Sequence, residues 1–141
     1  MKIPQNWTFR NKEVAESFDR HVREQLPWYD LATFAAAHIA RHYIPEGGVV
    51  LDLGASTGNI GRAIKQTLTD RKAKLIAIEQ SKEMCELYDA PGVIHCADLT
   101  AFDYPEYDVA VGFLCFMFLP VEKRKQVLKR LYEKAKPGGA I

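Results

Sequence analysis

The chain of 141 residues has few cysteines and no long hydrophobic run. Cys85, Cys96 and Cys115 are odd in number and lack the spacing of metal ligands, which favours a reducing cytoplasm over a disulfide-bonded extracellular scaffold. The longest apolar run, residues 110–120, is well below the about 20 residues that a membrane-spanning helix needs. Residues 1–18 contain no apolar segment of signal-peptide length, so we expect neither secretion nor a membrane span.

The chain also lacks an excess of charge of either sign. Lys and Arg total 19 against 18 Asp and Glu, and the net charge of +1 predicts no general attraction to nucleic acid or membrane. A composition that is 48% hydrophobic and 26% charged is typical of a globular protein. We expect one domain over residues 1–141, with a helical part at 1–44 and an α/β core at 45–141.

Two helices are predicted before the core. Asn11 is a suitable N-cap for the first, which Pro27 separates from the second. The apolar stripe of the first helix is formed by Val14, Phe18 and Val22. The second runs from about Asp30 to the turn at 45–48, and its stripe is formed by Leu31, Phe34, Ala35, His38, Ile39 and His42.

Strand and helix patterns alternate through the core. The predicted strands are Val49–Leu53, Leu75–Ile78, Val93–Cys96 and Val109–Gly112. The predicted helical segments are 60–68, 82–88 with Ser81 as cap, and 121–136. A turn at 137–139 then precedes a fifth strand that opens at Ala140. This alternation predicts a Rossmann-like, mainly parallel α/β sheet, truncated at the start of strand five, with the fourth strand near an open edge.

A glycine-rich turn, Gly54 to Gly58, follows the first strand. Gly54 allows the tight turn, and the missing side chain at Gly58 would let a ligand approach the backbone. The turn lacks the Lys-Ser/Thr pair of a phosphate-binding loop and the second glycine of a dinucleotide fingerprint. Asp52 would repel a pyrophosphate but can hold an ammonium group. A plain strand-to-helix turn is the alternative.

Two further acids follow neighbouring strands. Glu79 ends the second strand, where a carboxylate can accept both hydroxyls of a ribose. Asp98 follows the third strand and is placed to accept from an exocyclic amine. Each alone is explained by a solvated acid or a helix cap. Together with Asp52 and the glycine-rich turn, they predict a nucleoside site at successive strand ends.

The sequence here resembles the class I S-adenosylmethionine-dependent methyltransferases. Residues 51–58 resemble their first motif, Ile78-Glu79 the second-strand acid, Asp98-Leu99 the adenine-side motif, and 136–139 the turn before strand five. The likeness spans about residues 45–141 and implies S-adenosyl-L-methionine as cofactor, which we expect the two N-terminal helices to cover as a lid; no metal is expected. The implied cofactor-binding residues are Tyr29, Asp52, Gly54, Ala55, Ser56, Gly58, Glu79, Gln80, Asp98, Leu99 and Phe113. Of these, Gly54, Ser56 and Gly58 are expected at the methionine end, Glu79 at the ribose and Asp98 at the adenine.

A narrower likeness reaches the N-terminus. Trp7-Thr8-Phe9, residues 14–18 and residues 26–29 resemble the opening of the carboxy-S-adenosylmethionine synthases of tRNA wobble-uridine modification. Those enzymes join a carboxylate from prephenate to the methyl group of the cofactor, and the resemblance implies that Tyr29 reaches the cofactor. The chain departs from them at Phe113, where they carry Asn, and their carboxylate-binding Arg would lie beyond residue 141.

The acceptor is left open between a small molecule and RNA. Residues 113–118 follow the fourth strand, where methyltransferases form their acceptor pocket, and lack the Asn-Pro-Pro-Tyr-like motif of nitrogen methylases. The basic residues of the last helix predict a solvated face, with RNA contact as the alternative. His38 and His42 have no third metal ligand in view.

We therefore expect a cytoplasmic methyltransferase with an unidentified acceptor and no assigned catalytic residue. Carboxy-S-adenosylmethionine synthesis and cofactor binding without catalysis are the alternatives, and a homodimer is left open.

Overall fold

The computed structural model describes residues 8–141, so Trp7 of the N-terminal motif lies outside the described residues. Five strands form one sheet in the order β3-β2-β1-β4-β5, and every neighbouring pair is parallel. The strands are β1 (Val49–Leu53), β2 (Lys74–Glu79), β3 (Val93–Cys96), β4 (Tyr107–Val111) and β5 (Ala135–Ala140). The helices are α1 (Lys12–Gln25), α2 (Tyr29–Ala40), α3 (Asn59–Ala63), α4 (Lys65–Asp70), α5 (Lys82–Glu86) and α6 (Val121–Lys134), with a 3₁₀ turn η1 (Phe116–Phe118). The predicted Rossmann-like parallel sheet is confirmed.

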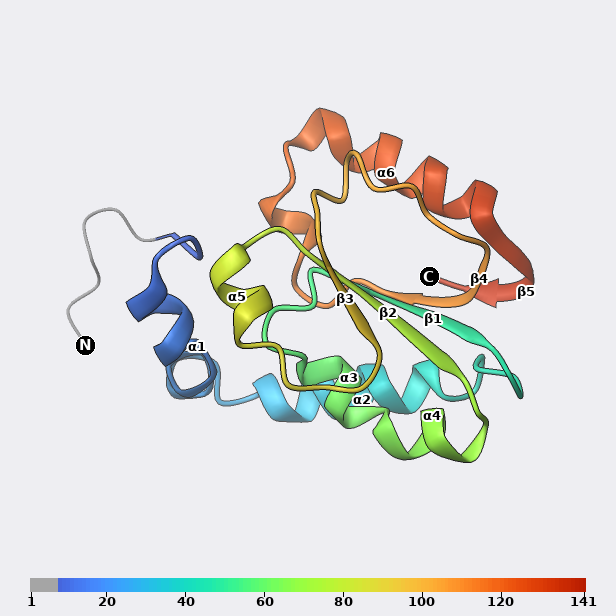
Figure 1. Cartoon of the computed structure of the whole chain (residues 1–141), viewed down its shortest axis with the longest axis horizontal. Helices are drawn as coiled ribbons and strands as arrows, with labels where there is room; N and C mark the ends of the chain where they lie inside the picture. The colour runs from blue at the N-terminus through green and yellow to red at the C-terminus, as the bar shows by residue number, and fades with distance from the viewer. Residues whose placement is uncertain (1–7) are drawn as a thin grey trace.

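Helices cover both faces of this sheet. Figure 1 shows α6 on one face and α2, α3 and α4 on the other, with α1 and α5 beyond one end of the strands. Leu51 and Leu53 of β1 pack in the core on the α6 side, and Val50 packs in the core on the α2 side. Because successive side chains of a strand point to opposite faces, β1 is buried on both, as its unbroken apolar run predicted.

The helix caps agree with the sequence. The Asn11 side chain accepts hydrogen bonds from the backbone N–H groups of Glu13 and Val14, and the Ser81 hydroxyl accepts from that of Met84. These side-chain acceptors satisfy N–H groups at the first turn that have no partner within the helix. The helical segment predicted at 60–68 is divided at Ile64 into α3 and α4.

The expected apolar stripe of α2 is not its buried face. Leu31, Phe34 and Ile39 are 73%, 65% and 61% exposed. The buried residues are instead Tyr29, Thr33, Ala37 and Ala40. Small side chains allow a close approach of this helix to α3 and the sheet, which a face of Leu, Phe and Ile would prevent. The helix therefore covers the sheet, and the lid expected from the N-terminal helices stays a prediction.

The C-terminal boundary also differs from the prediction. The last helix ends at Lys134, and β5 begins at Ala135, so Pro137, Gly138 and Gly139 lie within a strand and not in a turn. This strand covers β4 through the pairs Tyr107–Ala135 and Val109–Ala140, with a register irregularity between them. An edge strand tolerates proline, and the irregularity accommodates a glycine with φ of +80° at Gly138.

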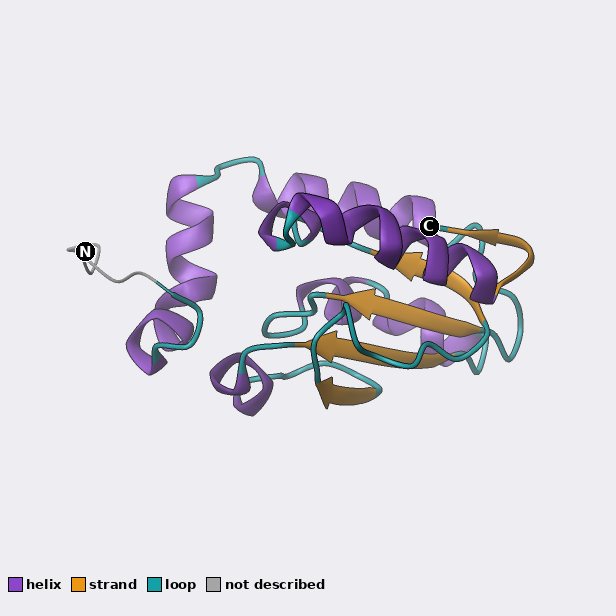
Figure 2. Cartoon of the chain, turned by 90° about the horizontal axis from the view of Figure 1, so that it is seen from above, coloured by secondary structure: helices purple, strands orange, loops and turns teal. Residues whose placement is uncertain are grey.

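Seen from above, α1 stands apart from the helices that lie along the sheet (Figure 2). Within residues 8–141, no helix is both long and apolar enough to cross a membrane.

Candidate functional site

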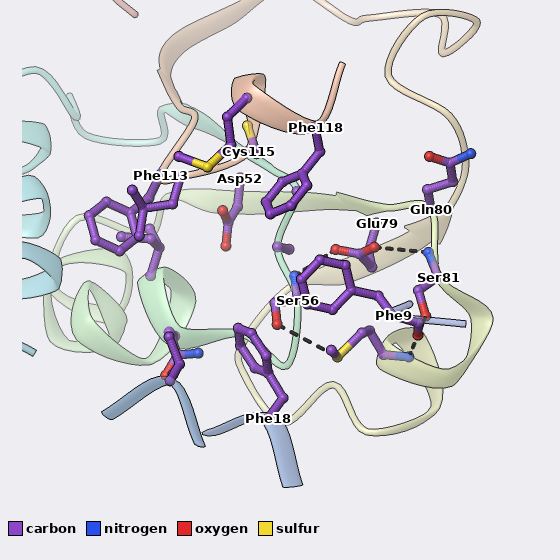
Figure 3. Close-up of a pocket in the computed structure, with 18 of the residues that line it drawn as sticks. Phe9, Phe18, Asp52, Ser56, Glu79, Gln80, Ser81, Phe113, Cys115 and Phe118 are labelled. Carbon is purple, nitrogen blue, oxygen red and sulfur yellow. Dashed lines mark hydrogen bonds between the residues drawn. The ribbon is translucent and has the colours of Figure 1, made fainter. Parts of the chain in front are cut away.

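A cavity of about 660 Å³ lies beside α1 at the carboxyl ends of β1 and β2 (Figure 3). The predicted site residues that line it are Tyr29, Asp52, Gly54, Ala55, Ser56, Glu79, Gln80, Leu99 and Phe113. Gly58 and Asp98 are not among its lining residues. Ligands of open α/β sheets bind at this edge, and the volume is within the usual range of small-molecule sites.

The glycine-rich turn is held against the end of β2. The backbone N–H groups of Gly54 and Ala55 both donate to the carbonyl of Ile78, at 2.9 and 3.0 Å. Gly54 has φ of +68°, and a Cβ there would lie 2.5 Å from the Cβ of Cys115. Glycine is therefore required at this position by the turn and by the close approach of the segment after β4.

Gly58 packs closely against another segment of the chain. Its φ is +100°, but a Cβ there would lie 2.6 Å from the Cβ of Ala90 and 3.1 Å from the Tyr88 ring. The space that we expected a ligand to use is filled by the segment after α5. Gly58 thus serves packing at the start of α3.

Asp52 is a buried carboxylate in the wall of the cavity, and one of its oxygens has no hydrogen-bond partner among the described residues. It is 2% exposed, and its Oδ2 is the one buried side-chain polar atom in residues 8–141 that lacks a hydrogen-bond partner. Burial first, and then the charge of Glu79, raise the pKa of Asp52 to about 7. An unpartnered carboxylate oxygen at the cavity wall favours a ligand that brings a hydrogen-bond donor or a positive charge.

Glu79 joins two loops around the cavity. Its Oε2 accepts from the N–H of Ser56 at 2.9 Å, and its Oε1 accepts from the N–H of Ser81 at 2.8 Å. The Ser56 hydroxyl in turn points to the Met84 sulfur, at 3.7 Å. Since a carboxylate offers about four acceptor positions, Glu79 retains lone pairs for ligand hydroxyls while it positions the backbone of Ser56.

Asp98 and Leu99, which follow β3, have different surroundings. Leu99 is 7% exposed and lines the cavity. The Oδ1 of Asp98 accepts from the N–H of Thr100 at 2.7 Å, so the carboxylate stabilises the turn that follows it. The hydrophobic member of the pair therefore faces the site.

A polar network between α1 and the turn was missed by sequence reasoning. Asp19 accepts from the Thr57 hydroxyl at 2.7 Å and from the Asn59 side-chain amide at 3.0 Å. Arg23 and Arg62 each donate to the side-chain oxygen of Asn59 at 3.0 Å. No local pattern indicates these contacts, because Asp19 is separated from its partners by almost forty positions.

Aromatic rings from distant segments also converge on the cavity. Phe9 lies edge to face with Phe18 of α1, at 5.6 Å between ring centroids, and with Phe118 of η1, at 5.3 Å. Figure 3 shows these three rings grouped beside Ser56 and Glu79. The four-residue spacing of Val14, Phe18 and Val22 predicts an apolar helix face, but it does not distinguish a face that packs in the core from one that borders a cavity.

Two arginines of α6 and Lys136 of β5 have partners within the chain, whereas Lys123, Lys125 and Lys134 are exposed. Arg124 donates to the carbonyls of Met117 and Leu119, Arg130 to those of Thr100 and Phe102, and Lys136 pairs with Asp108 at 3.0 Å. In the described part of the chain, no three His, Cys, Asp or Glu residues are grouped to hold a metal ion.

Residues 50–139 match the protein family described as Methyltransferase domain. The chain belongs to this family. Its similarity to solved methyltransferases agrees with the parallel sheet. One is the plantazolicin methyltransferase BpumL in complex with SAH, with a TM-score of 0.67 and 19% identity over 89% of this chain and 54% of that one. Another is DesVI of Streptomyces venezuelae, with a TM-score of 0.66 and 19% identity over the same shares. At such identities the likeness establishes the fold.

Curated relatives extend the similarity to the N-terminal helices. The carboxy-S-adenosyl-L-methionine synthase of Shewanella denitrificans is 28% identical over 93% of this chain and 58% of its own length. That of Staphylococcus epidermidis is 28% identical over 98% of this chain and 62% of its own length. The chain thus spans about three fifths of the relatives that it resembles.

Proposed function

We propose that this member of the methyltransferase family binds S-adenosyl-L-methionine and transfers a methyl group from it to an acceptor. The observation that carries the proposal is the buried, unpartnered Oδ2 of Asp52 beside the glycine-rich turn. A carboxylate in this position suits a ligand with an ammonium and a sulfonium group, whereas a phosphorylated nucleotide would meet two acids, Asp52 and Glu79.

The lining residues fit the parts of this cofactor. Asp52 would attract the ammonium group, and the backbone of Gly54, Ala55 and Ser56 would border the methionine part. Glu79, with Gln80 beside it, would accept from the ribose hydroxyls. Leu99 would pack against the adenine, and Tyr29 and Phe113, whose rings lie 5.5 Å apart, would close the side toward β4. Neither Gly58 nor Asp98 lines the cavity, so the roles expected for them at the methionine and at the adenine amine are not part of this proposal and stay predictions.

The residues around the cavity supply alignment and exclusion of water. When bound, the cofactor provides a sulfonium methyl group that passes to an acceptor lone pair as the methyl–sulfur bond breaks and the sulfur keeps the electron pair. Phe9, Phe18 and Phe118 border the cavity, and the Asp19 network joins α1 to the turn. Such positioning accounts for much of the acceleration of a two-substrate transfer. No acid or base of the chain is assigned to the reaction.

Calorimetric titration with S-adenosyl-L-methionine tests this proposal, with ATP as the comparison ligand. We expect heat and thermal protection with the former and neither with ATP. A chain that is protected by ATP and gives no signal with S-adenosyl-L-methionine would overturn the assignment.

Carboxy-S-adenosyl-L-methionine synthesis is the second candidate, favoured by the curated relatives, whose likeness covers nearly the whole chain. Incubation with prephenate followed by mass spectrometry of the recovered cofactor distinguishes the two activities. Phe113, at the position where that group carries Asn, lines the cavity and weighs against it. Tight binding without turnover on any acceptor would support a non-catalytic cofactor-binding protein instead. A homodimer and a cytoplasmic location stay predictions.

A further inference from the structure

The sheet order separates the two walls of the cavity. Strand β1 lies between β2 and β4, so the segment after β4 begins on the side of β1 away from Glu79, although the Phe118 ring of this segment reaches over to Phe9. In the proposed function the first wall, with Asp52 and Glu79, holds the cofactor. The second wall, of which Tyr29 and Phe113 also border the proposed cofactor, is left for the acceptor.

The second wall contains no charged side chain. After β4 it consists of Phe113, Leu114, Cys115, Met117, Phe118 and Leu119, and between α1 and the start of α2 it consists of Leu26, Trp28 and Tyr29. The Tyr29 hydroxyl, whose pKa burial raises to about 12, is neutral at physiological pH, as an ordinary tyrosine is. Both segments therefore offer apolar and aromatic surface to a ligand.

Two large apolar side chains of this wall are exposed to solvent and are not packed in the core. Phe116 and Leu119 pack against the core beneath α6. Met117 and Phe118, between them in the sequence, are 58% and 61% exposed and line the cavity. Large apolar side chains gathered at a cavity mark a binding surface for an apolar ligand.

Charge on the acceptor would be unfavourable here. An anion would face the carboxylates of Asp52 and Glu79 across the cavity. A cation would lose its hydration against residues 113–119 and would compete with the cofactor for the same two acids. The other ionisable side chains of the lining are Arg10 and His21 on the N-terminal side, and Tyr29 and Cys115 in the second wall.

We infer that the acceptor is an uncharged aromatic small molecule, bound between residues 113–119 and residues 26–29. Its ring would pack edge to face with Phe118 and with the Tyr29–Phe113 pair, in the geometry that these rings already adopt with their neighbours. This inference rests on the proposed function, since the cofactor assigns the remaining wall to the acceptor.

The test is calorimetry on protein saturated with SAH, with 2-naphthol as the neutral aromatic probe and 2-naphthoate as its anionic counterpart. We expect 2-naphthol to bind at least about tenfold more tightly than 2-naphthoate. Replacement Phe118→Ala should weaken the binding of 2-naphthol by about tenfold. The matched control is Phe34→Ala, which removes a similarly exposed ring outside the cavity lining and should leave the affinity unchanged.

Binding of SAH alone is measured first, so that a failure of the proposed function appears before either probe is added. The inference is overturned if SAH binds but 2-naphthol does not, if 2-naphthoate binds as tightly as 2-naphthol, or if Phe118→Ala behaves like Phe34→Ala. Replacement Met117→Ala provides a second variant of the same wall if Phe118→Ala does not fold.

Discussion

The Asp19 carboxylate accepts a hydrogen bond from the Thr57 hydroxyl at 2.7 Å, which joins α1 directly to the glycine-rich turn. Asn59, the first residue of α3, donates to the same carboxylate at 3.0 Å. The helix that carries Phe18 and the turn that borders the cavity are thus held together by side-chain contacts. Opening of the cavity on this side requires these bonds to break.

Replacement Asp19→Ala should loosen α1 and weaken cofactor binding. It removes the acceptor of both Thr57 and Asn59, and bonds to a charged acceptor contribute about 1.5–3 kcal/mol when the partner is buried. We expect a loss of about 1–2 kcal/mol in the free energy of unfolding and faster cofactor dissociation, measured by urea denaturation and stopped-flow fluorescence.

The control for this variant is Glu16→Ala on the same helix, whose side chain is 52% exposed and pairs with Lys12 at 3.7 Å. Exposed pairs contribute little, so Glu16→Ala should change stability by less than about 0.5 kcal/mol. Equal effects of the two variants would mean that the contact with Thr57 does not hold the helix.

Replacement Asp52→Asn should raise the stability of the ligand-free protein at pH 8 and lower its affinity for the cofactor. The folded-state pKa of about 7 lies above the unfolded value of about 3.9, so the folded state binds more protons between these limits. Stability of the unmodified chain should therefore fall as pH rises from about 4 to about 7, and cofactor affinity should rise as Asp52 becomes charged.

Thermal denaturation and calorimetry at pH 5.5 and 8 measure both effects. In the Asp52→Asn variant, the part of the pH dependence of stability and of cofactor affinity that comes from Asp52 should disappear. The control variant Asp103→Asn, at an exposed position, should keep the pH dependence of the unmodified chain. A variant that binds the cofactor normally at pH 8 would rule out the role proposed for Asp52.

Replacement Gly54→Ala should destabilise the fold more than Gly47→Ala. Both glycines have positive φ, +68° and +66°, so both variants incur the left-handed penalty of about 1–2 kcal/mol. Only at Gly54 would the new Cβ meet a neighbour, Cys115, whereas the site beside Gly47 is open. We expect Gly54→Ala to lower the free energy of unfolding by about 2–4 kcal/mol in total, measured by denaturant unfolding.

The double variant Gly54→Ala/Cys115→Gly removes the opposing Cβ and should recover part of that loss. No recovery would indicate that backbone strain alone accounts for the effect of Gly54→Ala.

Replacement Glu79→Ala should weaken cofactor binding by one or two charge-assisted hydrogen bonds, about 1.5–3 kcal/mol each. The ribose would lose its acceptor, and the N–H groups of Ser56 and Ser81 would lose theirs. Calorimetry checks this result against Glu106→Ala, at an exposed position on the loop before β4. An unchanged affinity would contradict the ribose assignment.

Local patterns in the sequence were sufficient for the architecture. The continuous β-branched run of β1 predicted a strand buried on both faces, and Asn11 and Ser81 marked helix starts that the structure confirms. Such signals can be recognised in a sequence because each depends on residues that are close to one another in the chain. The same holds for the acids and the glycine-rich turn at the strand ends, because parallel strands bring their carboxyl ends to one edge.

Only the tertiary structure decided which surfaces meet. The α2 sequence allows burial of either a face of large apolar side chains or a face of small side chains. Contact with α3 selected the face that carries Thr33, Ala37 and Ala40. The packing of Ala90 against Gly58 and the bond between Asp19 and Thr57 join positions that are far apart in the chain. The amino-acid order by itself therefore determined the elements and the edge of the sheet where the site lies. The composition of the cavity depended on long-range packing, in which steric fit between distant segments selects among faces that are locally equivalent.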